Sequence, residues 1–300
     1  MANPWLRSAA AFAALLLLSA CAQRGTATPA PSTSSSPSPS VDLPEDGAAL
    51  VLRVEYVGGF VPAEWNYSRL PLYSLYADGR LISDGPVDAS YPGPALPNVQ
   101  VQQLDAATVQ ELADRAVAAG VAETTYLGEP PIADAPSTRF TLTTADGTVV
   151  REVYALAEFV FEDDGMQTGL TDEQIAGRAR LQELLAALFD VGQQRTPDGR
   201  PPVDAYVPTA VAAIATAWSD PEEELTQPEQ PWPGPELPGE QVGGPLGVGC
   251  VVATGEQAAA VLAAAAQANA ATPWVSAGTR WTVLLRPLLP DEAGCADLGG

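Results

Sequence analysis

The chain has 300 residues, with 37 Asp and Glu residues against 14 basic residues and a formal net charge of −23. This acidic balance excludes the basic footprint that nucleic-acid binding requires. All the basic residues are Arg, and the absence of His and Lys excludes Ser-His-Asp and Cys-His nucleophiles, His-containing zinc sites, Schiff-base chemistry and Ser-Lys dyads. Catalysis would have to rest on carboxylates, Tyr, Arg or an oxygen-bound metal. The sequence contains no motif for a cofactor or a metal, so we expect neither.

Residues 1–20 are expected to be a lipoprotein signal peptide. One positive charge at Arg7 precedes an apolar run over 8–18, which is too short to span a bilayer because that takes roughly 20 apolar residues. The run ends in Leu18-Ser19-Ala20-Cys21, which resembles the lipobox of bacterial lipoproteins. The resemblance implies a mature chain that begins at Cys21, carries lipid on that thiol and lies at the extracytoplasmic face of the cell membrane. The alternative is an ordinary cleaved signal with Cys21 nearby by chance.

Residues 21–47 are expected to be the lipidated Cys followed by a disordered tether. The sequence after Cys21 mixes Pro, Ser, Thr and Ala, so it has no apolar face whose burial would offset the entropy cost of ordering. A Pro-rich chain favours the extended polyproline II conformation, which would carry the folded part up to roughly 75 Å from the lipid. Reach through a cell-wall layer and an inert spacer are both compatible with this segment.

Residues 48–218 are expected to form an α+β domain, in which antiparallel β-hairpins pack with two helices. Asp78-Gly79 and Asp146-Gly147 each lie between alternating segments, and this is a strong hairpin signal because type I′ turns need positive φ. The alternation predicts strands at 49–57, 72–76, 80–82, 99–102, 140–142 and 149–153.

Capping signals predict the two helices of this domain. The first is expected to start behind Asp105, whose side chain can cap free amide groups, and to end at Gly120. The second is expected to start at the capping box Thr171-Asp172-Glu173-Gln174 and to run to about Asp190. The Ala-rich residues 205–217 are compatible with strand or helix, and their β-branched residues favour strand.

An acidic, Pro-rich linker is expected over 219–242, followed by a small β-α-β unit over 243–300. The strands of this unit are expected at 248–252 and 279–285, with a helix between them that a capping box of Thr254 and Gln257 begins and that ends near Asn269. So small a unit is expected to lack a core of its own and to pack on the first region.

Cys250 and Cys295 are expected to form a disulfide that staples the small unit. Once Cys21 carries lipid, these two are the remaining pair in an oxidising compartment. A bridge between them would close a long loop and stabilise the fold by about 4 kcal/mol on chain-entropy grounds. Two free thiols are the alternative.

Three short motifs resemble segments of secreted bacterial lipoproteins of unknown function. Residues 75–80, Leu-Tyr-Ala-Asp-Gly-Arg, are similar to an LYxDGR hairpin in that group. Residues 132–138, Ile-Ala-Asp-Ala-Pro-Ser-Thr, resemble an xxDAPxT motif before the second hairpin, and residues 286–292, Arg-Pro-Leu-Leu-Pro-Asp-Glu, resemble an RPLLPDE ending. The signal and the tether fit the same group, and abundant Ala and Arg without Lys is typical of a high-GC Gram-positive source. The resemblance covers half of the mature chain and implies no activity.

The candidate site residues each have a structural interpretation that competes with the functional one. Asp134 is a candidate cleft carboxylate, but an Asp before a Pro-containing stretch more often caps a turn. The acidic runs 162–164 and 220–224 offer oxygen ligands for Ca²⁺, yet they lack the spacing and the Gly of an EF-hand loop, which favours solvated loops. Trp232 is a candidate partner contact. Its alternative role as an anchor of the linker is favoured, because an exposed Trp gains most by burying itself.

Three functions are compared on this basis. The tether and the lack of catalytic motifs favour a non-enzymatic envelope module, which reaches the membrane through lipid on Cys21 and binds an envelope protein or a wall component. The alternative is a carboxylate-dependent glycan hydrolase at the cell surface, which requires two carboxyl groups about 5–9.5 Å apart in a cleft. A ligand-binding lipoprotein that delivers to a transporter ranks last, because the chain lacks the length and the repeated βα pattern of a two-lobed binding protein.

Overall fold

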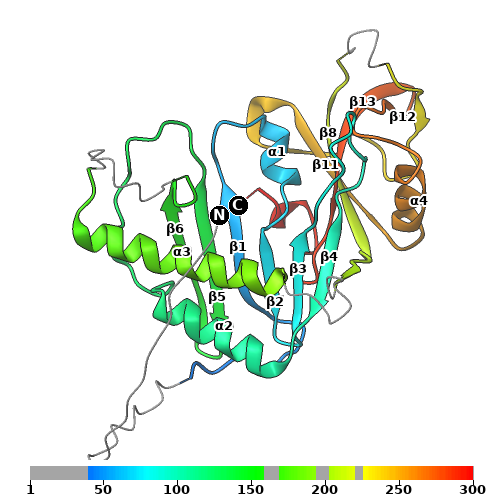
Figure 1. Cartoon of the computed structure of the whole chain (residues 1–300). Coiled ribbons are helices and arrows are strands. Elements are labelled where there is room, and N and C mark those ends of the chain that lie inside the picture. The colour runs from blue at the N-terminus through cyan, green and yellow to red at the C-terminus, as the bar shows by residue number, and fades with distance from the viewer. Residues whose placement is uncertain (1–39, 159–168, 194–202, 220–225, 300) are drawn as a thin grey trace, which may run out of the picture. The chain divides into compact units, whose positions relative to one another are not determined.

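The computed structural model describes residues 40–158, 169–193, 203–219 and 226–299. Cys21, most of the predicted tether and both acidic runs lie outside these residues. The described residues belong to one compact unit with two β-sheets and mixed α+β architecture, as predicted (Figure 1). None of the helices within these ranges has the length and hydrophobicity that a membrane span requires.

The first sheet has seven strands in the order β6-β5-β1-β2-β3-β4-β7, and its neighbouring strands are antiparallel. The strands are β1 (Leu50–Val57), β2 (Tyr73–Tyr76), β3 (Arg80–Asp84), β4 (Val99–Gln103), β5 (Ser137–Thr144), β6 (Gly147–Tyr154) and β7 (Val203–Ala205).

Both predicted hairpins are present, β2–β3 and β5–β6. In each turn the glycine takes a positive φ, 91° at Gly79 and 134° at Gly147, whereas the preceding Asp does not. The hairpins are therefore confirmed, but their turns are not of the expected type I′ form, which needs two residues with positive φ.

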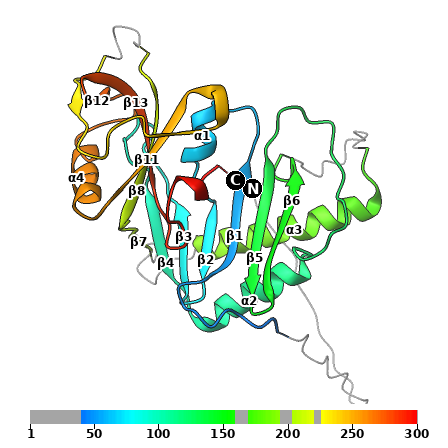
Figure 2. The ribbon, with the colours of Figure 1, turned by 180° about the vertical axis from the view of Figure 1, so that it is seen from behind.

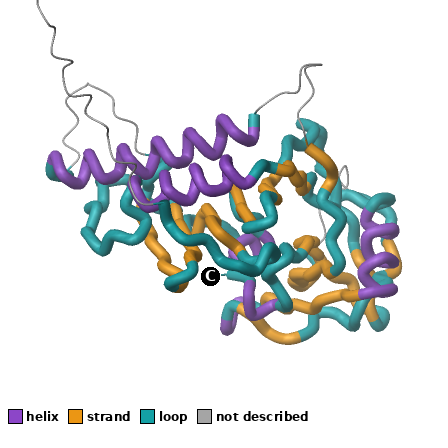
Figure 3. Tube along the Cα trace, turned by 90° about the horizontal axis from the view of Figure 1, so that it is seen from below, coloured by secondary structure: helices purple, strands orange, loops and turns teal. Residues whose placement is uncertain are grey.

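Two helices, α2 (Ala106–Ala118) and α3 (Asp172–Gly192), lie side by side across one face of the first sheet (Figures 1 and 3). Asp105 accepts the backbone N–H of Thr108 at 2.8 Å, and Thr171 and Gln174 form a reciprocal capping box, both as predicted. Alternate strand residues and the apolar faces of the two helices enclose the main core between them.

The second sheet has six strands in the order β10-β11-β8-β13-β12-β9. The strands are β8 (Ala210–Ala217), β9 (Gln230–Pro231), β10 (Glu240–Val242), β11 (Val248–Thr254), β12 (Trp274–Ser276) and β13 (Thr279–Pro287). The segment 205–217 thus contains a strand, and this strand lies between β11 and β13 at the centre of the sheet. The predicted linker supplies β9 and β10, which pair with β12 and β11.

The helix of the second sheet, α4 (Gly255–Ala265), is shorter than the sequence predicts and begins differently. Thr254 is its N-cap residue, but the side chain makes no capping hydrogen bond, so the predicted capping box with Gln257 is wrong. The physical reason is that Thr254 is also the last residue of β11, where it pairs with Ala210, and the strand sets its conformation. The helix still buries Ala258, Val261 and Ala265 against the sheet.

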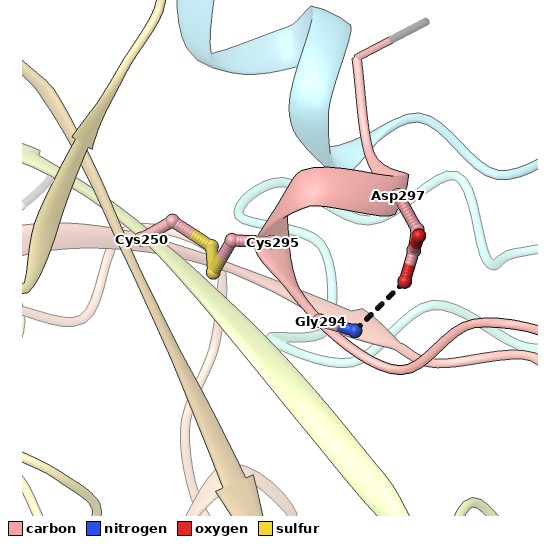
Figure 4. Close-up of a disulfide and its surroundings, with 4 residues drawn as sticks. All are labelled: Cys250, Gly294, Cys295 and Asp297. Carbon is pink, nitrogen blue, oxygen red and sulfur yellow. Dashed lines mark hydrogen bonds between the residues drawn. A yellow bond between two sulfur atoms is a disulfide. The ribbon is translucent and has the colours of Figure 1, made fainter.

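The chain end returns to the face of the first sheet that α2 and α3 leave uncovered (Figure 2). The disulfide between Cys250 and Cys295 is present, with the two Cα atoms 6.1 Å apart. It joins β11 to η3 (Cys295–Asp297), a short 3₁₀ helix in residues 288–299, here called the C-terminal segment (Figure 4). The remaining helix, α1 (Ala63–Ser68), packs on β8 and β13.

Candidate functional site

Two adjoining cavities lie beside α1, where the end of β1, the helix and the C-terminal segment meet. The polar cavity has a volume of about 260 Å³, and the apolar groove has a volume of about 520 Å³. Tyr56, Arg69 and Leu70 line both of them. The charged lining of the polar cavity consists of Arg53, Arg69, Arg139, Arg286, Glu55, Glu292 and Asp297.

Alternation along β1 places charged side chains at the polar cavity. The strand alternates residues of the main core with Arg53 and Glu55, so these two face away from the helices. The neighbouring strands complete this surface, since Ser74 of β2 pairs with Arg53 and Arg139 of β5 pairs with Glu55. Arg53 donates through Nε to the Ser74 hydroxyl at 3.1 Å, and Arg139 donates to Glu152 of β6 at 2.7 Å.

A buried ion pair from the RPLLPDE segment forms a wall of the polar cavity. Arg286 donates through Nη1 and Nη2 to the two carboxylate oxygens of Glu292, at 2.9 and 2.8 Å, and both side chains are 3% exposed. Glu292 also accepts the backbone N–H of Leu289 at 2.7 Å. This geometry is the bidentate pairing that holds an arginine and a carboxylate in one orientation.

Asp291 connects the C-terminal segment to the first sheet. Its Oδ1 accepts from Arg53 Nη2 at 2.7 Å and from the Tyr76 hydroxyl at 2.6 Å. Burial, together with the Asp291 carboxylate, raises the pKa of Tyr76 well above its usual value. Burial alone would lower the pKa of Arg53, but Asp291, Tyr76 and Glu292 more than reverse this and raise it. Both groups therefore hold their protons over the physiological range.

Glu55, in the lining of the polar cavity, forms only a long ion pair. Its nearest cation is Arg139, whose Nη1 lies 3.8 Å from Oε1. Burial raises the pKa of Glu55 above its usual value, although Arg53 and Arg139 act in the opposite direction. The folded protein therefore holds this proton to a higher pH than the unfolded chain does.

The Glu55→Gln variant is expected to gain stability relative to the parent as the pH rises. Because the pKa of Glu55 is higher in the folded state, its contribution is fully present below the unfolded pKa and is lost as the pH rises through the folded pKa. The amide of Gln does not ionise and escapes this loss. Urea unfolding of both proteins at several values between about pH 4 and pH 7 measures the difference. A difference that stays constant with pH would contradict the assignment.

Arg69 lies at the junction of the two cavities, and no carboxylate of the described residues forms an ion pair with it. Its Nη1 donates to the carbonyls of Tyr56 at 3.2 Å and Gly58 at 3.3 Å. Its own carbonyl accepts from Nε of Arg286 at 3.2 Å, which fixes the backbone at this position. Within the described ranges, no Asp or Glu lies within salt-bridge distance of its guanidinium, and neither Nε nor Nη2 makes a hydrogen bond to the protein. Among the described residues, the half-buried guanidinium of Arg69 therefore makes hydrogen bonds only to backbone carbonyls.

The apolar groove on the other side of α1 is bordered by an exposed aromatic ring. Trp65 of α1 lines it and is 53% exposed. Pro94, Ala95 and Pro97 form the opposite side, and the groove also includes Val61, Leu70, Leu72 and Leu284. Large apolar side chains left exposed beside a groove are typical of a surface that binds another molecule.

The sequence-predicted site residues do not gather at these cavities. Asp134 has a left-handed backbone with φ of 59°, and its carbonyl accepts the N–H of Phe60 at 3.1 Å; a capping bond from its carboxylate is not found among the described residues. Trp232 is 9% exposed, packs edge-on against Trp274 and donates to the Pro235 carbonyl at 2.6 Å. That placement anchors residues 226–242 on the second sheet and leaves little of the ring for a partner. No metal-ligand cluster is found in the ranges searched, which exclude both acidic runs.

The motif at 286–292 was the sequence signal closest to the site. It supplies Arg286, Asp291 and Glu292, whereas Arg53 and Arg69 gave no signal because their partners are distant in sequence.

Comparison of the chain with family models, curated proteins and solved structures finds no match. The resemblance to secreted lipoproteins therefore stays a prediction, and the geometry of the site carries the functional interpretation.

Proposed function

We propose that this protein is a lipid-anchored, non-enzymatic binding module at the extracytoplasmic face of the cell membrane, with its ligand site beside α1. The observation that supports the binding site is the apolar groove, which is about 520 Å³ in volume and is lined by the exposed ring of Trp65. This volume lies within the range of roughly 300–1,000 Å³ that ligand pockets occupy. The lipobox ending at Cys21 supports the membrane anchor.

The arrangement of carboxylates favours binding over glycan hydrolysis. A glycosidase needs two carboxyl groups that both reach the substrate, one of them as an acid. Glu55 and Glu292 line the same polar cavity, but Glu292 is 3% exposed and is held by Arg286 on both oxygens. Asp297 accepts the N–H groups of Ala293 and Gly294 (Figure 4 shows the second bond). Of the carboxylates that line this cavity, Asp297 is therefore the one that could still partner Glu55, and two backbone N–H groups already fix the orientation of its Oδ2.

Photo-crosslinking from the groove in intact cells tests this proposal. We expect a full-length chain that carries a photoreactive benzophenone side chain in place of Trp65 to acquire one discrete added mass on irradiation. The same side chain in place of Tyr126, which is 66% exposed and lies outside both cavities, is the matched control and should not acquire that mass. Mass spectrometry of the purified chain reads out the result. The same adducts at both positions, or none at position 65, would contradict a ligand site in the groove.

The anchor is tested in the same cells. The Cys21→Ser variant lacks the thiol that takes the lipid, and we expect it to leave the membrane fraction while the parent chain stays there. A variant that sediments with the membranes as fully as the parent would show that the attachment has another cause.

A further inference from the structure

We propose that the polar cavity and the apolar groove form one site for an anionic amphiphile, a single acyl chain that ends in a phosphate or carboxylate group. The acyl chain would occupy the groove, and the anionic group would bind Arg69 at the junction. This inference rests on the proposed function and specifies the chemical class of the ligand.

The first argument is the state of Arg69. A positive charge removed from water is stable when it is paired, and one left without a counter-charge is costly. The other arginines of the polar cavity have carboxylate partners: Arg53 pairs with Asp291, Arg139 with Glu152, and Arg286 with Glu292. In the part of the chain that the structure describes, Arg69 donates through Nη1 alone, to two backbone carbonyls. Its Nε and Nη2 therefore offer donors in the fixed geometry that matches phosphate and carboxylate oxygens.

The second argument is the charge of the surroundings. The chain carries a formal net charge of −23, so a free anion is repelled by most of the surface. Four of the 14 arginines nevertheless line this one cavity. An anion without an apolar part would gain little here, because the paired arginines are already neutralised. An anion attached to an apolar chain also gains free energy from burying that chain in the groove.

The third argument is that the two spaces share lining residues beside α1. Tyr56, Arg69 and Leu70 belong to both linings, so a molecule that contacts Arg69 from the groove needs no separate channel. Apart from Arg69 and Asp84, the groove offers mostly apolar walls from different elements, including Val61, Trp65, Leu70, Leu72, Pro94 and Leu284. Each methylene buried there contributes about 0.8 kcal/mol, so a chain is favoured over a compact apolar group.

The binding of three small probes to the chain separates the contribution of the anionic group from that of the acyl chain. The Cys21→Ser chain keeps the whole protein and omits the native lipid. We expect decyl phosphate, below its micelle concentration, to bind at least tenfold more tightly than decanol, and inorganic phosphate alone to bind more weakly than either. Isothermal titration calorimetry measures all three. Equal affinities of decyl phosphate and decanol would overturn the requirement for an anion, and phosphate binding as tight as that of decyl phosphate would overturn the requirement for a chain.

Variants at the junction and in the groove locate the site. Arg69→Gln should weaken decyl phosphate about ten- to a hundredfold, the range for a charged hydrogen bond, while leaving decanol unchanged. Arg69→Lys keeps the charge but loses the planar pair of donors, so it should bind more tightly than Arg69→Gln and more weakly than the parent, and this order guards against a loss that comes from misfolding. Trp65→Ala should weaken decyl phosphate and decanol alike. Arg115→Gln on α2 and Tyr126→Ala are the matched controls, because both residues are exposed outside the two cavities, and both should bind as the parent does.

The outcomes also distinguish this inference from the proposed function. An added mass at position 65 in cells, combined with no binding of decyl phosphate, would overturn the amphiphile and leave the binding module standing. Binding of decyl phosphate that is unchanged in Arg69→Gln would place the anion elsewhere and overturn the inference. The absence of any added mass at position 65 contradicts both.

Discussion

Replacing Glu292 by Gln is expected to lower the free energy of unfolding by about 3–5 kcal/mol, the cost of breaking a buried ion pair from one side. Arg286 and Glu292 are each 3% exposed and share two hydrogen bonds. A neutral amide at 292 would leave the charged guanidinium of Arg286, which is only 3% exposed, without its counter-charge. Urea unfolding monitored by tryptophan fluorescence measures the loss.

Two controls make the Glu292 result interpretable. Glu111→Gln removes one partner of the exposed pair with Arg115, whose side chains are 61% and 55% exposed, and should cost only about 0.3–0.5 kcal/mol. The double variant Arg286→Met with Glu292→Leu removes both buried charges and should recover most of the stability. If Glu292→Gln costs no more than Glu111→Gln, the buried pair does not hold the fold in the way its geometry indicates.

The same ion pair relates stability to the candidate site. Arg286 comes from β13 of the second sheet, and its Nε holds the carbonyl of Arg69 at 3.2 Å. Asp291, the neighbour of Glu292, holds Arg53 of the first sheet at 2.7 Å. The C-terminal segment therefore joins the two sheets at the position where the cavities lie. We infer that the polar network positions Arg69 as well as stabilising the fold.

Local signals were sufficient for the helices and the hairpins of the first sheet. The N-cap Asp105 and the capping box at Thr171 place hydrogen bonds between residues three positions apart, so the sequence contains both partners. The glycines at 79 and 147 likewise mark turns whose strands pair with their immediate neighbours. Such contacts can be predicted because the interacting groups are adjacent in the chain.

The parts that the sequence did not predict depend on distant partners. Arg178 of α3 is fully buried, and it donates to the carbonyls of Leu127, Gly128, Tyr154 and Ala155 at 2.6 to 3.3 Å. A charged residue in a helix is usually solvated, and nothing near it in the sequence indicates these carbonyls. The short strand β9 was missed for the same reason, since its parallel pairing with β12 joins residues more than 40 positions apart. The strand β12 was missed although it pairs with its neighbour β13 through a local turn. The candidate site also depends on partners that are distant in sequence, because Arg53 and Asp291 are 238 positions apart.

Removal of the disulfide is expected to lower the free energy of unfolding by about 4 kcal/mol, through the chain entropy of the unfolded state. Cys250 and Cys295 are separated by 45 positions, and the closed loop includes α4, β12 and β13. The variant Cys250→Ala with Cys295→Ala keeps two small apolar side chains where the cysteines are 1% and 6% exposed. Urea unfolding of this variant, beside the parent with and without reductant, measures the effect. Unfolding of the reduced parent at the same urea concentration as the oxidised parent would contradict it.

The disulfide prediction also has a consequence for the site. Asp291 and Glu292 lie just before Cys295, so the covalent bond keeps their carboxylates close to Arg53 and Arg286 when the segment fluctuates. Amide hydrogen exchange over residues 288–299 should therefore accelerate in the double Ala variant more than exchange in α2, which packs on α3 and β1 of the first sheet. Equal acceleration in both places would mean that the disulfide stabilises the fold as a whole and has no separate effect on the C-terminal segment. A selective increase would mean that the same bond stabilises the second sheet and holds the wall of the polar cavity in position.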